Sequence, residues 1–115
     1  MQVVKNKETN KVSPSATTTI WEYLADSQDI SGAVAQVNGR YPEKGFAVNE
    51  ISKELAFVVS GNGKIVSSSG ETSLDLGDVI LIQPNEPFAW EGNFTIFMAT
   101  APTFDPKQHK IHKII

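Results

Sequence analysis

The stretch from residue 54 to residue 90 constrains the fold more than any other part of the chain. It reads ELAFVVSGNGKIVSSSGETSLDLGDVILIQPNEPFAW, in which short apolar runs alternate with glycine, asparagine or proline. Runs of this kind, rich in β-branched and aromatic residues, are typical of buried strands bounded by turns. A helical interpretation would place Gly61, Gly77 and Pro84 inside helices, where glycine costs about 1 kcal/mol and proline about 3 kcal/mol. The stretch therefore predicts strands throughout.

Similar runs lie on both sides of this stretch, and nowhere do ten residues keep a clean helical period. Strands are expected at residues 18–24, 32–38, 46–51, 54–60, 64–67, 72–76, 79–83, 88–90 and 93–100. Eight or nine short strands at regular spacing, with turn signals between them, are typical of an antiparallel sandwich or barrel. The pattern predicts an all-β fold.

The length of 115 residues predicts one domain. Three parts are expected within it. Residues 1–17 are polar and are expected to form an N-terminal arm that adds a strand to a neighbour, with a disordered lead-in as the alternative. Residues 18–102 form the expected barrel. Residues 103–115 form a C-terminal tail that ends HKIHKII, either packed as a last turn and strand or frayed.

Composition excludes several classes of function. The net charge is -3 and Arg40 is the single arginine, which argues against a nucleic-acid partner. The absence of cysteine excludes disulfides and thiolate chemistry and favours a cytoplasmic location. No apolar run reaches the roughly 20 residues of a membrane span, so no membrane partner is expected.

Residues 45–93 resemble the two sequence motifs of the cupin family, which are small jelly-roll barrels built as a double-stranded β-helix. The first motif ends E-x-x-x-x-x-x-G, and Glu54 and Gly61 match this spacing. The second motif opens with Gly-Asp, which matches residues 77–78, and its proline stands one place late, at residue 84. The resemblance implies an all-β jelly-roll barrel.

The same resemblance carries over the family's metal ligands poorly. The three histidines of the family are replaced by Ala47 and Asn49 (or, with the shorter spacing, Val48 and Glu50) and by Phe88. Only the glutamate ligand is kept, as Glu54. Losing three imidazoles removes most of the nitrogen donors that suit transition metals. No metal and no other cofactor are therefore expected, with an atypical set of Glu50, Glu54 and His109 as the alternative.

Glu54 and Asn49 are the polar candidates for a ligand-binding site. A carboxylate inside an apolar barrel is expected to have a raised pKa, which suits acid–base work or contact with a polar ligand. The alternative is a strand-end charge paired with Lys53 or Lys64. Because side chains alternate along a strand, only one of Asn49 and Glu50 can share a face with Glu54, and the neutral Asn49 is favoured.

Aromatic and histidine residues supply the remaining candidates. Phe88 and Trp90 lie two residues apart, so they share a face and are expected to form the walls of a ligand site, with barrel core or a dimer interface as the alternative. Tyr41 is a weaker candidate. His109 and His112 are expected on the surface among lysines; the alternative is that His109 folds over the barrel mouth and joins Glu54.

These observations predict a barrel that binds a small polar molecule, sugar-like or a carboxylate, without the family's usual metal. Whether the chain is an enzyme stays open at this point. One alternative is a small isomerase or lyase with Glu54 as general base. The others are a metal-dependent enzyme with the atypical ligands and a structural module with a filled barrel. The resemblance, together with Trp21 and Tyr23, also implies a homodimer through the N-terminal strands.

Overall fold

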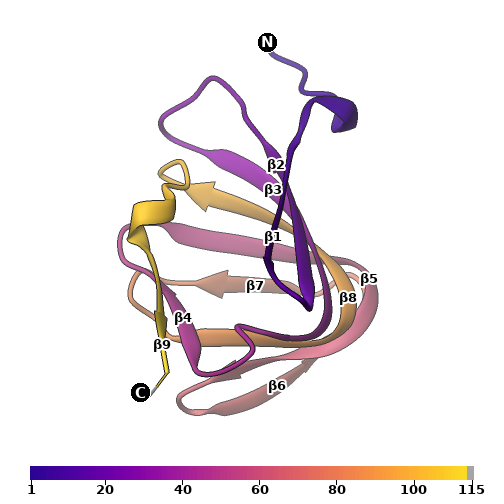
Figure 1. Ribbon diagram of the computed structural model, residues 1–115, viewed down its shortest axis with the longest axis vertical. Helices are drawn as coiled ribbons and strands as arrows, with labels where there is room; N and C mark the ends of the chain where they lie inside the picture. The colour runs from indigo at the N-terminus through magenta and orange to yellow at the C-terminus, as the bar shows by residue number, and fades with distance from the viewer. Residues whose placement is uncertain (114–115) are drawn as a thin grey trace.

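The computed structural model describes residues 1–113, and these form an all-β fold with two short 3-10 turns (Figure 1). The all-β prediction is confirmed. In chain order the strands are β1 (Asn10–Ser15), β2 (Thr18–Tyr23), β3 (Ser31–Tyr41), β4 (Phe46–Asn49), β5 (Lys53–Ser67), β6 (Gly70–Leu74), β7 (Val79–Ile82), β8 (Phe88–Ala101) and β9 (His109–His112). The 3-10 turns are η1 (Asn6–Glu8) and η2 (Pro106–Gln108).

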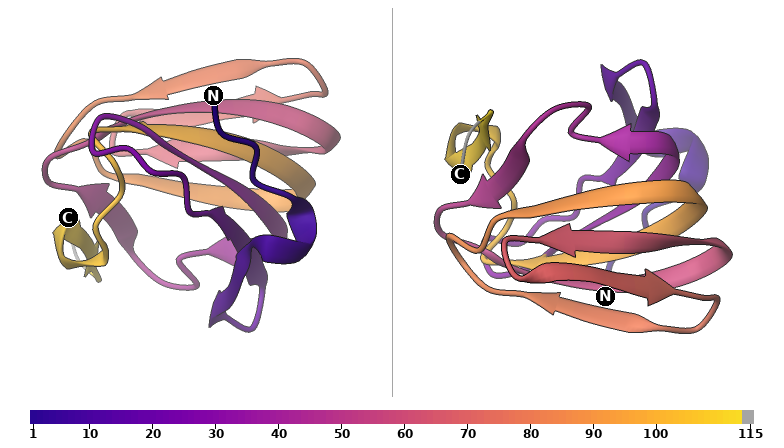
Figure 2. Two further views of the ribbon diagram at one scale, coloured as in Figure 1. Left: turned by 90° about the horizontal axis from the view of Figure 1, so that it is seen from above. Right: turned by 90° about the horizontal axis from the view of Figure 1, so that it is seen from below.

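The strands form one antiparallel, strongly curled sheet around β8. The path β1-β2-β3-β8-β4-β9 is continuous, and β5 joins it by pairing with β8, β6 and β7. Figure 2 shows that the hairpin of β5 and β6 lies on one side of the curl, and that the N-terminal hairpin and the C-terminal segment lie on the other. The sheet therefore encloses an interior that both ends of the chain help to cover.

Two pairs of predicted strands are each a single long strand in the structure. The runs 54–60 and 64–67 form β5, and 88–90 and 93–100 form β8; the two strands pair along their whole lengths. Gly61 and Gly92 make this possible, because both have positive φ and a Cβ on either one would collide with the partner strand's backbone. The register shift lies between residues 58 and 60, just before the Gly-Asn-Gly where a bulge was expected.

The two ends of the chain join the sheet. β1 pairs with β2 of the same chain, so the first strand of the predicted arm is ordered. η2 leads into β9, which pairs with β4 so that His109 lies opposite Asn49. The last two residues of the predicted tail, 114–115, lie outside the described residues. Nothing among residues 1–113 forms a helix long and apolar enough to cross a membrane.

The hydrophobic core occupies part of the barrel interior. Phe88, Trp90 and Phe94 meet edge to face, with neighbouring ring centroids 6.1 Å apart, and each is at most 3% exposed. The inward positions of β5 alternate, so Ala56 and Val58 point into this core. The next inward position toward the start of β5 is Glu54, where the packed interior gives way to a cavity.

Candidate functional site

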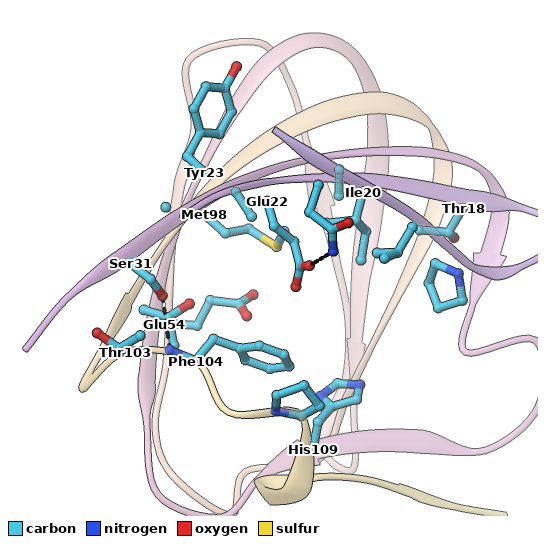
Figure 3. A pocket seen from close by; sticks show the side chains of 18 of the residues that line it. Thr18, Ile20, Glu22, Tyr23, Ser31, Glu54, Met98, Thr103, Phe104 and His109 are labelled. Carbon is cyan, nitrogen blue, oxygen red and sulfur yellow. Dashed lines mark hydrogen bonds between the residues drawn. The ribbon is translucent and has the colours of Figure 1, made fainter. Parts of the chain in front are cut away.

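A cavity of about 530 Å³ lies inside the barrel next to the hydrophobic core. This volume is within the range of small-molecule sites. Strands β2 and β3 form one wall, β5 and β8 form the other, and the segment from Thr103 to His109 covers one end (Figure 3). The lining is mostly apolar, with a few polar side chains that include Glu54, Tyr41 and His109.

Glu54 is the buried acid of this cavity. Its side chain is 6% exposed and points inward from β5. Oε1 accepts a long hydrogen bond of 3.5 Å from Asn49 Nδ2, and Oε2 is buried without a hydrogen-bond partner. Burial raises the pKa of Glu54 from 4.5 to about 7, although the bond from Asn49 lowers it in part. The carboxyl group therefore has one free oxygen and a pKa close to neutral.

Asn49 connects Glu54 to a second pair of polar side chains. The pairing of β4 with β9 sets Asn49 opposite His109, and Asn49 Oδ1 lies 2.8 Å from His109 Nδ1. His109 Nε2 lies 2.8 Å from the hydroxyl of Tyr41 at the end of β3. Because the amide of Asn49 donates to Glu54, its oxygen accepts from Nδ1–H, and Nε2 accepts from the Tyr41 hydroxyl. The four residues form one directed hydrogen-bond chain.

Burial also shifts the pKa values of His109 and Tyr41 in this hydrogen-bond chain. It lowers the pKa of His109, which keeps the imidazole neutral as the bonding pattern requires. Burial also raises the pKa of Tyr41, and the nearby negative charge of Glu54 adds to this effect. The rings of Tyr41 and His109 are stacked, and Phe104 meets His109 edge to face. At neutral pH, Glu54 is thus the member of the chain that changes protonation state most readily.

The four residues predicted to bind a ligand lie in one region, but they have different positions. Glu54, Phe88 and Trp90 line the cavity. Phe88 and Trp90 are each 3% exposed and also belong to the core, which was the alternative for them. Asn49, 1% exposed, lies behind Glu54 and bonds to it instead of lining the cavity. Ligand binding by these residues stays a prediction.

His109 departs from its sequence-based expectation. It was expected on the surface, but β9 places it against the cavity with Asn49 and Tyr41 as partners, which is the alternative in which it covers the barrel mouth. His112 is exposed, as expected. The pairing of β4 with β9 brings together residues 60 positions apart, and a single sequence has no local signal for such a contact. Glu22 and Met98, which also line the cavity, were missed for the same reason.

The metal of the cupin family does not fit the donors present. Ala47 and Phe88 at the corresponding positions are buried and have no donor atoms. Within residues 1–113 no three histidine, cysteine, aspartate or glutamate side chains are grouped so that they could hold a metal ion. Glu50, in the alternative set with Glu54 and His109, is exposed on a bend. The residues present therefore do not form the metal site of the family.

Comparison with known proteins defines the class of fold. No family model and no curated protein sequence matches the chain. Among solved structures, Pac13 of Streptomyces, a nucleoside dehydratase, has a TM-score of 0.88 at 17% identity and covers 100% of this chain and 93% of its own. KdgF from Halomonas sp. has a TM-score of 0.72 at 13% identity, with 92% and 99% covered. An RmlC-like cupin from Shewanella frigidimarina has a TM-score of 0.73 at 10% identity, with 90% and 92% covered. The chain has the cupin fold, as its motifs implied.

Proposed function

We propose that this small cupin-fold protein is an acid–base enzyme, a lyase or isomerase in which Glu54 removes a proton from a small organic molecule. The observation that carries the proposal is that Glu54 lines a cavity large enough for a substrate and that its buried Oε2 has no hydrogen-bond partner. A general base works best when its pKa lies near the operating pH, and burial brings the pKa of Glu54 to about 7. An unpartnered buried carboxyl group is otherwise a cost to the fold.

In the proposed lyase step, the carboxyl group of Glu54 acts first as the base and then as the acid. The Glu54 carboxylate takes a proton from a carbon next to a carbonyl, a carbon–carbon double bond forms, and the hydroxyl on the next carbon leaves. The carboxylic acid just formed gives its proton to that hydroxyl, which departs as water, and Glu54 is ionised again. In an isomerase the proton returns to a different carbon. Asn49 orients Glu54 in both cases, and the Tyr41 oxygen, whose hydrogen is directed to His109, can accept a bond from the substrate.

The comparison with Pac13 gives the proposal a first class of substrate to test. Pac13 is described as a nucleoside dehydratase, and structures of three of its variants contain uridine. Loss of water is a lyase reaction of the kind set out above. At 17% identity the comparison establishes the fold alone, so it supports the choice of nucleosides without assigning them. The aromatic walls formed by Phe88, Trp90 and Phe104 suit a flat ring.

The test is proton exchange in heavy water. Sugars and nucleosides that carry an aldehyde or ketone, a C–H on the adjacent carbon and a hydroxyl on the carbon after that are incubated with the protein, and proton NMR follows loss of the acidic C–H signal or release of an alkene product. The Glu54→Gln variant should lose at least a hundredfold in rate, since general-base catalysis contributes about 10²–10⁴. It should keep its thermal shift with the same compounds, because the cavity is unchanged.

The opposite result supports non-catalytic binding. If compounds stabilise the wild-type protein but none exchanges a proton, Glu54 acts only as a hydrogen-bond partner for a ligand. A matched control is Glu50→Gln, which changes an exposed carboxylate a few residues away and should alter neither rate nor stabilisation.

A further inference from the structure

The charged side chains of the cavity are all of one sign. Two carboxylates, Glu22 and Glu54, are among the described residues that line it, and no lysine or arginine is. Figure 3 shows both carboxyl groups pointing into the cavity, Glu22 from β2 and Glu54 from β5. The amide of Asn10 donates to Glu22 Oε1 at 2.7 Å, which holds this carboxylate in place. When both groups are ionised, a bound molecule therefore meets negative charge from two walls.

Two cations, Arg40 and Lys11, belong to residues next to lining residues in the sequence, and both are held by other groups. The Arg40 guanidinium donates to the carbonyl oxygens of Pro42 and Gly45, and it lies over the ring of Phe46. The ammonium group of Lys11 lies over the ring of Trp21, 5.7 Å from its centroid. Neither Arg40 nor Lys11 lines the cavity. In an interior of low polarity, charges interact more strongly than in water, so this imbalance affects any charged ligand.

We infer that the cavity selects neutral or cationic molecules and excludes phosphorylated and carboxylated ones. The inference rests on the proposed function, because it names the substrate class of the same site. It narrows the expectation from sequence, in which a sugar-like molecule and a carboxylate were equally acceptable. A free nucleoside or sugar fits the cavity, whereas its phosphate ester meets two carboxylates without a compensating cation.

The experiment uses three probes that share a phenyl ring and differ in charge: cationic benzylamine, neutral benzyl alcohol and anionic benzoate. The reporter is the methyl group of Met98, which lines the cavity, in protein labelled at its two methionines. A Met98→Leu sample assigns the signal. The cationic and neutral probes should shift it in a saturable way, and benzoate should bind at least tenfold more weakly. Glu22→Gln should narrow the gap between benzylamine and benzoate.

Two outcomes overturn the inference: benzoate binding as tightly as benzyl alcohol, or no shift of Met98 with any probe. Failure here is distinct from failure of the proposed chemistry. Proton exchange on an anionic substrate would overturn charge selection and leave Glu54 as the base. Charge selection without proton exchange on any compound would leave a binding site without acid–base chemistry.

A different observation, on the outside of the barrel, supports a second proposal. Outward-facing apolar residues pair across five neighbouring strands, β2, β3, β8, β5 and β7. The row runs Trp21, Val34, Phe97, Phe57, Val79, and a parallel row contains Leu55 and Leu81. We call these seven residues the outer band. Phe57 is 42% exposed and Phe97 41%, so large aromatic surfaces face outward.

The area and composition of the outer band fit a second copy of this chain. Together with Val59, the outer-band residues of β5, β7 and β8 expose on the order of 600 Å² of apolar surface. This area is at the upper end of the range for the largest apolar patch on a typical monomer. Two such faces together bury roughly 1,200 Å², the lower end of stable interfaces. The seven residues of the band are all apolar, and the ammonium group of Lys11 lies over the band only at its Trp21 end. A two-fold axis can place the band against itself.

We propose that the outer band is the interface of a homodimer formed by sheet-on-sheet packing. This moves the expected dimer contact from the N-terminal strands to β5, β7 and β8, with Trp21 at one end of the interface. Glu54 faces inward from β5, and the next residue, Leu55, faces outward into the proposed interface. The dimer contact would therefore also fix the position of the strand that carries Glu54.

Light scattering after size-exclusion chromatography tests the dimer. The wild-type mass should be that of two chains, and Phe97→Lys should be monomeric. Ile111→Lys is the matched control, since Ile111 is 42% exposed on β9, outside the band, and it should stay dimeric. Val79→Lys, at a 59% exposed position, repeats the test if Phe97→Lys is unfolded by circular dichroism. A monomeric wild type or a dimeric Val79→Lys would overturn the proposal.

Discussion

Strand β5 passes through two regions of the barrel interior that are built in opposite ways. Around Val58 the interior is filled, with Phe94 and Ile96 packed at 2% and 0% exposure. Around Glu54, two inward positions earlier, the same strand borders a cavity and a buried oxygen has no partner. The packed region gains stability from contacts, whereas the cavity region has a carboxyl group that the fold alone would not favour. Such a cost is expected where a site is kept for function.

The largest effect that separates the two regions is expected from Phe94→Ala. Phe94 is 2% exposed and meets Trp90 edge to face. Its loss should lower the free energy of unfolding by about 3–5 kcal/mol, because a cavity replaces a buried ring. Urea denaturation at pH 5 and at pH 8 measures this, and the loss should be the same at both. A loss below about 1 kcal/mol would mean that the packed region is not the main source of stability.

The second effect, from Glu54→Gln, should depend on pH. The folded-state pKa of Glu54 is about 7 and the ordinary value is 4.5, so between these values the folded protein binds more protons than the unfolded chain. Stability from this group is therefore complete below pH 4.5 and is lost as pH rises through 7. The loss is about 3 kcal/mol, at 1.36 kcal/mol per pKa unit. Glutamine, which stays neutral, should make the protein more stable than wild type at pH 8 by about this amount.

Urea denaturation across pH measures the Glu54 effect, and carbon NMR of the side-chain carboxyl group gives the midpoint directly. The titratable neighbours are Tyr41, His109 and Glu22. The lowered pKa of His109 acts in the opposite direction, since its contribution is lost as pH falls below 6.5, so the difference between wild type and variant isolates Glu54. A titration midpoint of Glu54 near pH 4.5 would mean that burial at the cavity does not disfavour its charged form, which would contradict the contrast drawn between the packed region and the cavity region.

The third effect concerns the hydrogen-bond chain at the cavity. Tyr41→Phe removes the hydroxyl that donates to His109 Nε2 and leaves a part-buried acceptor without this partner. The free energy of unfolding should fall by about 1–2 kcal/mol. Nitrogen NMR of the His109 ring should show the proton on Nδ1 in both proteins, because Asn49 still accepts it. A proton on Nε2 in the wild type would contradict the direction of the chain.

More of the packed region than of the cavity could be predicted from the sequence. The strands of residues 54–90 follow from local patterns, namely apolar alternation along β5 and the glycines at 61 and 77. Glu54 was found because it stands at a motif position inside an apolar run. His109 was expected on the surface, with a place at the barrel mouth only as the alternative, because its neighbours in sequence are lysines and its neighbours in space come from β3 and β4. Contacts made by pairing distant strands depend on the whole topology, which local pattern does not contain.

The smallest effect compares the same substitution in the two regions. Ile96→Val deletes a methylene group from a fully packed site and should lower the free energy of unfolding by about 1 kcal/mol. Ile20→Val, on the cavity wall, should lower it by less, because one side of Ile20 already faces empty space and has fewer contacts to lose. Both are measured by urea denaturation under one set of conditions. Equal losses would show that the cavity wall is as tightly packed as the core, and the interior would then have no room for a ligand beside Glu54.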